Sequence, residues 1–531
     1  MNIEKGTIMK TALISVYHKD GIIEFAQALM ELGFTIYASG GTFKHLSENS
    51  ITALPVSDLV GGEAILGHRV VTLSREVHAG LLAKNTEEDI AELASLAIPR
   101  LDLVCVDLYP LEAEIAKPGS TRESVIEQTD IGGPTMIRSA AKGGRVVICD
   151  PQDRQWVIDW LKAGEPANGF VDELSAKGEF TIAKYCMTSA NYLSNGKYAG
   201  FSGERVATCK YGENAWQAPA YLYSAGTHDP LALDKFVVAE GTPPSYNNWA
   251  DIDRLLQTAS HIAGAYAINE GVGIAIAVGV KHGNPCGAAA GPDRAEVLKK
   301  MMSGDPLAIF GGLVMVNFEV NEALCEVLAG KMLDGIIAPA FTAGAIAMLR
   351  RKGDKCRFVV NPALSGLSDN LDWTPRFRCV RGGFLVQPNY TFIPALSDER
   401  IKRYGTATPM QEDDMLLAWA IGSTSNSNTI TLVKNEQLIG NGVGQQDRVG
   451  AAHLAITRAR RSGHDVTGAS AYSDSFFPFP DGPQTLIDAG VTAIFTSSGS
   501  IKDQATIDVC AKHNVALYMV PDQAGRGFFG H

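Results

Sequence analysis

The chain has 531 residues, of which 46% are hydrophobic and 20% are charged, a balance typical of a folded globular protein with several structural units. Its formal net charge of −12 and the lack of a basic run argue against a general nucleic-acid binder. No apolar stretch reaches the roughly 18–20 residues of a membrane helix, so we expect a cytoplasmic protein without a membrane partner.

The first 160 residues alternate between strand-like and helix-like patterns. Apolar runs typical of strands lie at 11–16, 34–38, 101–108 and 145–149, and helical patterns separate them. This alternation predicts a parallel sheet covered by helices. A polar helical stretch at about 170–193 precedes a link rich in glycine and serine, so we place the main boundary near residue 200 and expect domains at 1–200 and 201–531.

Two strand-to-helix turns of the predicted sheet carry hydroxyl groups, backbone amides and a lysine. The first contains Ser15 and Lys19, and the second is Ser39-Gly40-Gly41-Thr42. Helix N-termini present free N–H groups and a positive dipole, so these turns predict a phosphate site. An ordinary glycine turn with a Ser or Thr cap is the alternative.

A second set of acidic, basic and donor side chains lies at loop edges of the same domain. Tyr109 follows a predicted strand, Asp130 precedes a pair of glycines, and Lys142 follows a pair of alanines. These residue types suit proton transfer, whereas helix capping and solvated charge are the alternative. Sequence spacing does not establish that the three side chains meet.

Two further α/β stretches lie beyond residue 200, at about 204–380 and 390–531, and an irregular connection at 360–391 joins them. In the first stretch, a buried-strand pattern at 274–280 ends at Lys281-His282 and a glycine-rich turn at 283–287. A proton donor and a proton acceptor thus stand where a strand ends, a place where open α/β sheets carry chemistry. The alternative is a surface lysine beside a hydrogen-bonding histidine.

Three phenylalanines framed by prolines and acids lie in the segment from Asp474 to Asp481. The segment is too compact for a regular helix face, and it predicts a rigid wall for a flat heterocycle. Core packing is the alternative for Phe477, but it explains the Asp481 end poorly. The nine cysteines are scattered, with no Cys-x-x-Cys pair and no Cys/His spacing suited to zinc, so we expect no metal site.

Taken in order, the short motifs of the chain resemble those of a family of bifunctional purine-biosynthesis enzymes. The matching segments are SV..K, ASGGT, LYP, DIGG, AAK, KYG.N, SYNN..D, KHGNPCG, DP...FGG, DGIIAP, SN, GQQ.R, D.FFPF.D and SGS, and they span nearly the whole length. The family combines an IMP cyclohydrolase domain with a 5-aminoimidazole-4-carboxamide ribonucleotide (AICAR) formyltransferase.

The resemblance implies an α/β fold in which a methylglyoxal-synthase-like parallel-sheet domain precedes a formyltransferase part with two cytidine-deaminase-like subdomains. Zinc-dependent deamination is excluded, because the His-x-Glu and Pro-Cys-x-x-Cys signatures are both absent. The family also implies a homodimer whose formyltransferase sites form between subunits.

For the C-terminal part, the resemblance implies transfer of a formyl group from the co-substrate 10-formyl-tetrahydrofolate to the 5-amino group of AICAR, with no metal in the chemistry. That amine is conjugated to its ring and needs a base, the role that the family gives to the residue matching His282. Lys281 would protonate the departing folate nitrogen or stabilise charge there. Asn428 would hydrogen-bond the formyl oxygen as it becomes tetrahedral.

The resemblance also implies the binding residues. Those for AICAR are Lys210, Tyr211, Asn248, Asp334, Arg448 and Arg526, and those for the folate are Phe476, Phe479, Asp481, Ser498 and Gly499. The cyclohydrolase site would contain Ser15, Lys19, Ser39, Gly40, Gly41, Thr42, Tyr109, Asp130 and Lys142.

The N-terminal domain departs from the family pattern at several positions. Val71 stands where the family has the lysine that it uses in ring closure. Tyr17 and His18 replace a Ser-Asp pair, and Asp107 replaces an asparagine. Ring closure eliminates water and needs only groups that orient the formyl group and move protons, so the loss of one ammonium group would slow it by a few powers of ten.

We therefore expect an AICAR formyltransferase with an attached, impaired cyclohydrolase. One alternative, favoured by Val71, is a monofunctional formyltransferase whose N-terminal domain only binds nucleotide or stabilises the dimer. Another is a non-catalytic purine-nucleotide sensor, against which the retained folate-facing residues argue.

Overall fold

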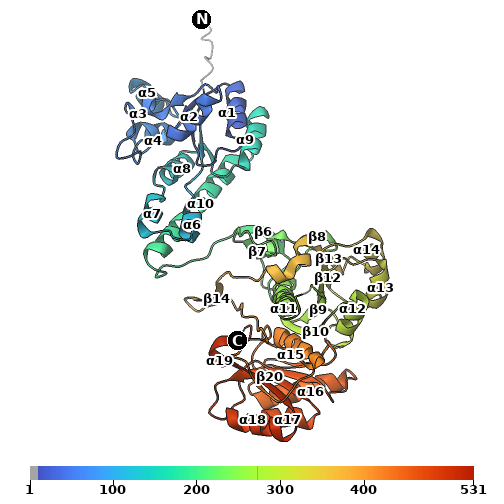
Figure 1. Cartoon of the computed structure of the whole chain (residues 1–531). Helices are drawn as coiled ribbons and strands as arrows, with labels where there is room; N and C mark the ends of the chain where they lie inside the picture. The colour runs from blue at the N-terminus through green and yellow to red at the C-terminus, as the bar shows by residue number, and fades with distance from the viewer. Residues whose placement is uncertain (1–9, 272, 531) are drawn as a thin grey trace. The chain divides into compact units, whose positions relative to one another are not determined.

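The computed structural model describes residues 10–271 and 273–530. The chain divides into two compact units, Met1–Ser202 and Gly203–His531, coloured blue to teal and green to red in Figure 1. None of the helices described in these ranges is both long enough and apolar enough to cross a membrane.

The N-terminal unit is built on a five-stranded parallel sheet with the order β3-β2-β1-β4-β5, as the alternating pattern predicts. Its strands are β1 (Lys10–Ser15), β2 (Phe34–Ala38), β3 (Leu54–Pro55), β4 (Leu103–Val106) and β5 (Val146–Ile148). The chain proceeds outward from β1 on one side and from β4 on the other. The strand order therefore reverses between β1 and β4, and at such a switch point the loops diverge and leave room for a ligand.

Helices cover both faces of this sheet. They are α1 (Ile22–Glu31), α2 (Gly40–Glu48), α3 (Val56–Val60), α4 (Arg75–Leu82), α5 (Glu87–Ser95), α6 (Leu111–Ala116), α7 (Arg122–Glu127), α8 (Gly132–Lys142), α9 (Asp153–Lys162) and α10 (Phe170–Leu193). Successive residues of β1 alternate between the two layers. Ala12 and Ile14 pack in the core with α1 and α9, whereas Leu13 packs in the other core with α4 and α8.

The first half of the C-terminal unit contains a six-stranded sheet with the order β10-β9-β11-β12-β13-β8. Its strands are β8 (Val237–Glu240), β9 (Ala275–Lys281), β10 (Asn284–Gly291), β11 (Leu313–Val316), β12 (Gly335–Ala338) and β13 (Arg357–Val360). A separate hairpin, β6 (Glu204–Cys209) with β7 (Ala220–Ser224), and the short helix η1 (Leu233–Lys235) precede it. The helices are α11 (Tyr246–Glu270), α12 (Arg294–Ser303), α13 (Glu322–Leu328) and α14 (Ala343–Leu349).

The second half repeats this organisation with the sheet order β16-β21-β20-β19-β17-β18. Its strands are β16 (Lys402–Tyr404), β17 (Ile430–Val433), β18 (Leu438–Gly442), β19 (Ser470–Ser473), β20 (Ala493–Ser498) and β21 (Ala516–Pro521). Its helices are α15 (Pro409–Gly422), α16 (Arg448–Arg461), α17 (Asp481–Asp488), α18 (Asp503–Lys512) and α19 (Asp522–Gly525). Both halves thus place a long helix before a hairpin and three helix-connected parallel strands, which confirms two α/β subdomains of one topology.

The two subdomains share one apolar core. Residues of α11 and α15 pack in it together with strand residues from both sheets, such as Val278 of β9 and Phe495 of β20. Two further cores lie on the other faces, one with α12 to α14 and one with α16 to α18. The segments that follow β9 and α15 therefore lie next to the same apolar core, and this arrangement positions the site.

Two local expectations need correction. The turn after β9 consists of only His282 and Gly283, because 284–291 forms strand β10 rather than a glycine-rich loop. Residues 360–391 are not irregular throughout, since they contain η2 (Pro362–Asp369) and a hairpin of β14 (Arg376–Val380) with β15 (Gly383–Gln387). In both cases the strands pair with a strand close to them in sequence. Their glycine, proline and exposed residues do not form a strand pattern in the sequence.

Candidate functional site

The histidine singled out by the sequence lies in a tight turn between β9 and β10. His282 and Gly283 both have positive φ, 53° and 69°, which is the backbone of a two-residue type I′ turn. The Gly283 N–H donates to Oδ1 of Asp251 at 2.7 Å, and this carboxylate projects from α11. The turn therefore presents an exposed imidazole from a backbone that the helix holds in place.

Lys281 is the last residue of β9 and faces the loop before β11. Its Nζ donates to the carbonyl oxygen of Phe310 and lies 6.0 Å from the centre of that ring. Lys281 and His282 both line a cavity of about 430 Å³, which Arg458 and Arg461 also line. Asp305 also lines this cavity and pairs with both arginines, at 3.1 and 3.3 Å, so the three cations and one carboxylate leave a net positive lining.

Asn428 belongs to the second subdomain, yet its segment contacts the β9–β10 turn. The Asn426 N–H donates to Oδ1 of Asn284 at 3.3 Å. In β18, Nδ2 of Asn441 donates to the Pro285 carbonyl oxygen at 3.0 Å. The Asn428 amide itself donates to the Gln445 carbonyl oxygen at 2.9 Å through Nδ2, a group that carries a second N–H.

The carboxyl group of Asp251 lies beside the turn. Burial raises the pKa of Asp251 above its usual value, while the hydrogen bond from Gly283 and the charge of His282 oppose that shift. The carboxylate of Asp334 raises this pKa further. The imidazole, the buried acid and Asp334 therefore lie within one electrostatic neighbourhood.

The AICAR residues expected in the first subdomain surround the start of α11. Asn248 is buried and completes the capping box of this helix. The side chain of Asn247 donates to the Glu213 carbonyl oxygen at 3.2 Å, which brings the loop that begins at Lys210 to the same helix end.

Asp334 and Tyr211 meet through an arginine that the sequence did not single out. Arg357 donates from Nη1 to the Asp334 carbonyl oxygen at 3.0 Å. Burial lowers the pKa of Arg357, and Asp334 and Tyr211 both oppose this shift through their charges. Arg357 thus links the two expected AICAR residues.

The remaining AICAR residues lie in the second subdomain, where β19, β20 and β21 end. Arg448 donates from Nη2 to Oδ1 of Asp474 at 3.3 Å, and both residues are largely buried. Arg526 forms an ion pair with Asp522 at 3.5 Å. Because these strands are parallel, their carboxyl ends bring the two pairs to one edge of the sheet.

Asp474 connects this edge to Asn428. Burial raises the pKa of Asp474, and a hydrogen bond from the Ser427 side chain and the charge of Arg448 oppose the shift. The Asp474 N–H donates to the Thr429 carbonyl oxygen at 3.3 Å. Residues on both sides of Asn428 therefore contact this acid.

The folate residues lie at the same edge. A Cβ placed on Gly499 would come within 3.9 Å of the Phe476 ring, so these two residues are neighbours. Phe479 is 57% exposed, whereas Phe477 is buried in the core, as the alternative for that residue predicted. Asp481 begins α17, and the Ser498 hydroxyl donates to the Val520 carbonyl oxygen at 3.4 Å.

In the N-terminal unit, the two phosphate-type turns meet beside β1. The Ser39 hydroxyl donates to the Ser15 hydroxyl at 2.7 Å, and Gly40 and Gly41 open α2. Lys19 donates to the carbonyl oxygens of Val16 and Tyr17 and, at 3.4 Å, to the Thr42 hydroxyl. Burial lowers the pKa of Lys19, and the charge of Asp107 opposes that shift.

Tyr109 and Asp130 also lie close together. Burial and the charge of Asp130 raise the pKa of Tyr109, and burial raises the pKa of Asp130 itself. Asp130 accepts a hydrogen bond from the Gly133 N–H at 2.9 Å, and its own N–H donates to the Tyr185 hydroxyl at 2.7 Å. Lys142 ends α8, about 15 Å along the axis from Gly132, so a single chain does not bring it to Asp130.

The substituted residues of this domain lie at the same place. His18 contacts Asp107 through Nδ1 at 2.9 Å, and the Tyr17 ring packs 5.6 Å from the Tyr109 ring. The segment containing Val71 lies next to the start of α8, because a Cβ on Gly132 would come within 2.6 Å of the Thr72 hydroxyl.

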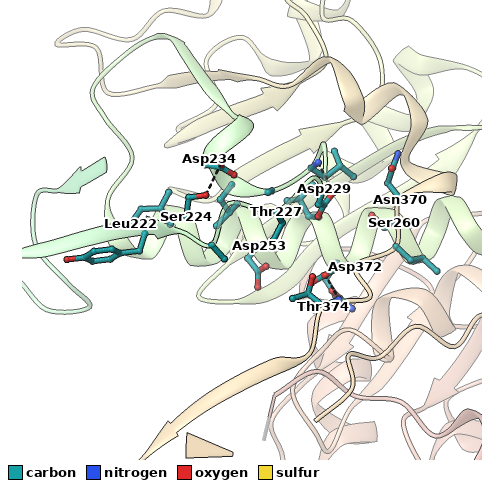
Figure 2. Close-up of a pocket in the computed structure, with 18 of the residues that line it drawn as sticks. Leu222, Ser224, Thr227, Asp229, Asp234, Asp253, Ser260, Asn370, Asp372 and Thr374 are labelled. Carbon is teal, nitrogen blue, oxygen red and sulfur yellow. Dashed lines mark hydrogen bonds between the residues drawn. The ribbon is translucent and has the colours of Figure 1, made fainter. Parts of the chain in front are cut away.

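A separate cavity of about 250 Å³ lies in the C-terminal unit between the loop after β7, α11 and residues 370–374. Figure 2 shows Asp229, Asp234, Asp253 and Asp372 around it. Among these acids, Asp234 accepts from the Ser224 hydroxyl at 2.9 Å, and Asp253 pairs with Arg376 at 3.2 Å. None of the expected site residues lines this cavity.

Several site residues were missed by sequence reasoning. Asp251, Asn284 and Arg357 form hydrogen bonds around the β9–β10 turn and Asp334, and Tyr185 supports Asp130. Asp251 could have been found, because it lies three residues after Asn248 on one helix face. Within the described residues, no group of three or more His, Cys, Asp or Glu side chains could hold a metal ion.

Comparisons with known proteins match both units. The family model described as AICARFT/IMPCHase bienzyme matches residues 140–458, and the one described as MGS-like domain matches residues 21–135. Two relatives, both named bifunctional purine biosynthesis protein PurH, come from Bacillus thuringiensis (strain Al Hakam) and Bacillus cytotoxicus. They are 36% and 35% identical over 96% of this chain and 98% of their own lengths. A solved structure titled "Crystal structure of ForH" is 31% identical, covers 36% of this chain and 99% of that chain, and has a TM-score of 0.33.

Proposed function

The chain belongs to the AICARFT/IMPCHase bienzyme family, and on that premise we propose that it transfers the formyl group of 10-formyl-tetrahydrofolate to AICAR and then closes the product to IMP. The observation that supports formyl transfer best is the contact of the Lys281-His282 turn with the Asn428 segment through Asn284 and Asn426. This contact supports a site to which the two subdomains contribute a proton acceptor, a cation and an amide donor.

His282 is the general base of the proposed transfer. As the 5-amino nitrogen of AICAR bonds to the formyl carbon, His282 takes the proton that the nitrogen loses. The type I′ turn fixes the imidazole relative to α11, because the turn N–H is bound to Asp251. A base held in this way loses little conformational entropy when the reactants meet.

Lys281 and Asn428 act on the other side of the reacting carbon. As that carbon becomes tetrahedral, the second N–H of the Asn428 amide donates to the developing oxyanion, an interaction worth about 3 kcal/mol in comparable sites. The bond to the folate nitrogen then breaks, and Lys281 supplies the positive charge or the proton that the leaving nitrogen needs.

The substrate-holding residues fall into two groups. Asn248, Tyr211 and Asp334 surround the start of α11, whereas Arg448 and Arg526 lie at the carboxyl edge of the second sheet. At that edge the Phe476 ring and Gly499 are neighbours, which supports placement of the folate ring there.

Two assays on the purified protein test the function. The first measures tetrahydrofolate release from AICAR and the formyl-folate, and the second measures IMP formation from the isolated formylated intermediate. Turnover in both supports the proposal. Turnover in the first alone would establish a monofunctional formyltransferase, and AICAR binding without turnover in either would establish a nucleotide sensor.

We also propose that the chain forms a homodimer. The β14–β15 hairpin supports this, because Val380, Leu385 and Val386 are 45%, 60% and 47% exposed on it. Leu385→Asp should shift the protein toward monomer in sedimentation velocity at micromolar concentration, whereas Asp369→Asn, outside the hairpin, should not. A monomeric wild-type protein, or a dimer unaffected by Leu385→Asp, would contradict the role of this hairpin.

A further inference from the structure

Two residues that depart from the family pattern contact each other in the N-terminal unit. Nδ1 of His18 lies 2.9 Å from Oδ2 of Asp107, and the backbone N–H of His18 donates to the same oxygen at 2.7 Å. His18 follows β1 and Asp107 follows β4. The pair therefore bridges the switch point of the sheet, where the two loops diverge.

The surroundings of this pair are those of the proposed cyclohydrolase site. The Tyr17 ring lies 5.0 Å from the His18 ring and 5.6 Å from the Tyr109 ring. Lys19 and Asp130 both interact electrostatically with Asp107. By contrast, the Val71 side chain is aliphatic and partly buried, so it offers no proton to a reacting group.

The contact fixes which nitrogen of His18 is available. A carboxylate only accepts hydrogen bonds, so the neutral imidazole donates from Nδ1 and carries its lone pair on Nε2. The His18 side chain is 56% exposed, whereas that of Asp107 is 15% exposed. The buried acid thus orients an accessible imidazole with its basic nitrogen away from the acid, as in other histidine and aspartate pairs that move protons.

We propose that His18, oriented by Asp107, is the proton-transfer group for ring closure in this chain and does the work that falls to a lysine elsewhere in the family. The inference rests on the proposed cyclohydrolase function of this unit. The carboxamide nitrogen of the formylated intermediate bonds to the formyl carbon while Nε2 of His18 takes one of its two protons, and the formyl oxygen becomes a hydroxyl group.

The second half of the reaction returns that proton. The carbon–oxygen bond breaks as protonated His18 donates to the departing hydroxyl group, which leaves as water. The formamido nitrogen loses its proton to solvent, the proton taken up earlier by the new hydroxyl came from solvent, and the carbon–nitrogen double bond of the purine ring forms. One water molecule is released and no oxidant or reductant is consumed.

Asp107 is a positioning residue, because it acts through His18. A merely structural role is the competing explanation, since the same carboxylate also accepts from the loop backbone. The backbone N–H and Nδ1 of His18 both contact one oxygen of Asp107, so Asp107→Asn keeps that oxygen as their acceptor and with it the Nδ1–H tautomer, but it removes the negative charge that stabilises the protonated imidazole.

The test is cyclisation of the isolated formylated intermediate by the full-length protein. His18→Gln should lower kcat by about 10² to 10³ with KM within about threefold. Formyl transfer in the other unit should stay at the wild-type rate and controls for the amount of protein, while the unchanged KM for the intermediate reports that the N-terminal unit is folded. The matched control His45→Gln, which changes a histidine in the last turn of α2, should cyclise like the wild type.

A pH profile separates proton transfer from structure. Tyr17, Tyr109, Lys19 and Asp130 lie around His18 or its partner Asp107, and all of these groups are unchanged in His18→Gln. The wild-type kcat should fall on acidification because a protonated Nε2 accepts no proton, and this limb should be absent in His18→Gln. Asp107→Asn should lower kcat about tenfold with little change in KM, because the protonated imidazole loses its charged partner.

Two results would overturn the inference, and they differ from each other. If the wild type cyclises the intermediate and His18→Gln does so with unchanged kcat, His18 is not the proton-transfer group, while the cyclohydrolase function stands. If the wild type does not cyclise the intermediate but still transfers formyl groups, both the proposed role of the His18–Asp107 pair and the proposed cyclohydrolase function are wrong.

Discussion

His282 adopts a left-handed backbone conformation, which determines the variant that tests it. Asparagine tolerates positive φ better than alanine does, so His282→Asn removes the base while it keeps the turn. We expect formyl transfer to fall by about 10² to 10⁴ in kcat. AICAR affinity, measured by calorimetry, should stay within about tenfold of the wild type.

A histidine far from the turn provides the comparison. His513→Asn changes an exposed residue at the end of α18 and should leave formyl transfer unchanged. Turnover by His282→Asn within a few fold of the wild type would remove His282 from the role of base.

Single residues differ in how far the sequence could predict their positions. The place of Lys281 and His282 was predictable because the apolar run before them marks a buried strand that ends there. Lys142 was grouped with Asp130 by residue type, but an eleven-residue helix lies between them and carries them apart. The contact of His18 with Asp107 spans 89 residues, and only the sheet order brings the two loops together.

At the scale of elements, both subdomains contain the same contact, in which an aspartate of a long helix accepts from a backbone N–H of a hairpin turn. In the first, Asp251 of α11 accepts from the N–H of the β9–β10 turn. In the second, Asp414 of α15 accepts from the N–H of Glu436 at 2.6 Å, in the β17–β18 turn. Both turns have two residues with positive φ, but the second has Asn435 where the first has His282. The second turn therefore has the same backbone conformation and the same support from a helix, but it has no histidine.

The second turn also lies in an acidic cluster, which gives a pH prediction. Burial, followed by the charges of Asp413 and Glu436, raises the pKa of Glu270 to about 6. The folded protein thus binds this proton more tightly than the unfolded chain does, and the stabilisation is present at pH 4 and lost as the pH rises through about 6. Glu270→Gln removes the ionisation, so its stability relative to the wild type should increase between pH 4.5 and 7.5.

The expected gain is no more than about 1 kcal/mol, because Glu270 is largely exposed and water screens its charge. Urea unfolding of both proteins at the two pH values measures it. A relative stability that is unchanged or reduced at pH 7.5 would show that the cluster does not repel Glu270.

The close packing of α16 on β18 gives a prediction about the position of Arg448. A Cβ on Gly442 would overlap the Ala451 carbonyl oxygen and the Ala455 N–H group. Gly442→Ala should therefore cost about 1–3 kcal/mol of unfolding free energy and displace the start of α16. The KM for AICAR should rise, since Arg448 is the first residue of that helix.

Gly273→Ala is the matched control, because a Cβ there would meet nothing within 4 Å and its φ is not positive. Thermal unfolding and AICAR kinetics of the two variants should separate them. Equal stability of Gly442→Ala and the wild type would mean that the helix can shift without cost.

The elements that the sequence predicted are those with a clear burial pattern. Helix α10 and strand β2 have the predicted bounds, and β1 begins one residue before its predicted range. Strand β10 was missed because Gly287 and its alanine neighbours have low strand propensity. Glycine is nevertheless required at 287, since a Cβ there would overlap the Met301 carbonyl oxygen of α12. The β14–β15 hairpin was missed because both of its faces are exposed, so no alternation marks it.

At the scale of the whole molecule, the two units have separate cores and should unfold separately. We expect two transitions in differential scanning calorimetry of the full chain. Gly178→Ala should lower only one of them, because its Cβ would lie 2.9 Å from the Ile137 side chain within the N-terminal unit. Gly442→Ala should lower only the other.

A single transition that moves as a whole in both variants would contradict this independence. So would a shift of both transitions by either substitution. Activity measurements after heating between the two transitions give a second readout, since one of the two reactions should be lost before the other.

The contact between His18 and Asp107 also restricts the order in which these positions can change during evolution. Replacing His18 by aspartate while Asp107 remains would set two carboxylates against each other and force one of them to hold a proton. Replacing Asp107 by asparagine first leaves a neutral partner for the imidazole. In a lineage that changes from the family's aspartate and asparagine to this pair, the two carboxylates are never present together only if position 18 changes first. The reverse change must begin at position 107.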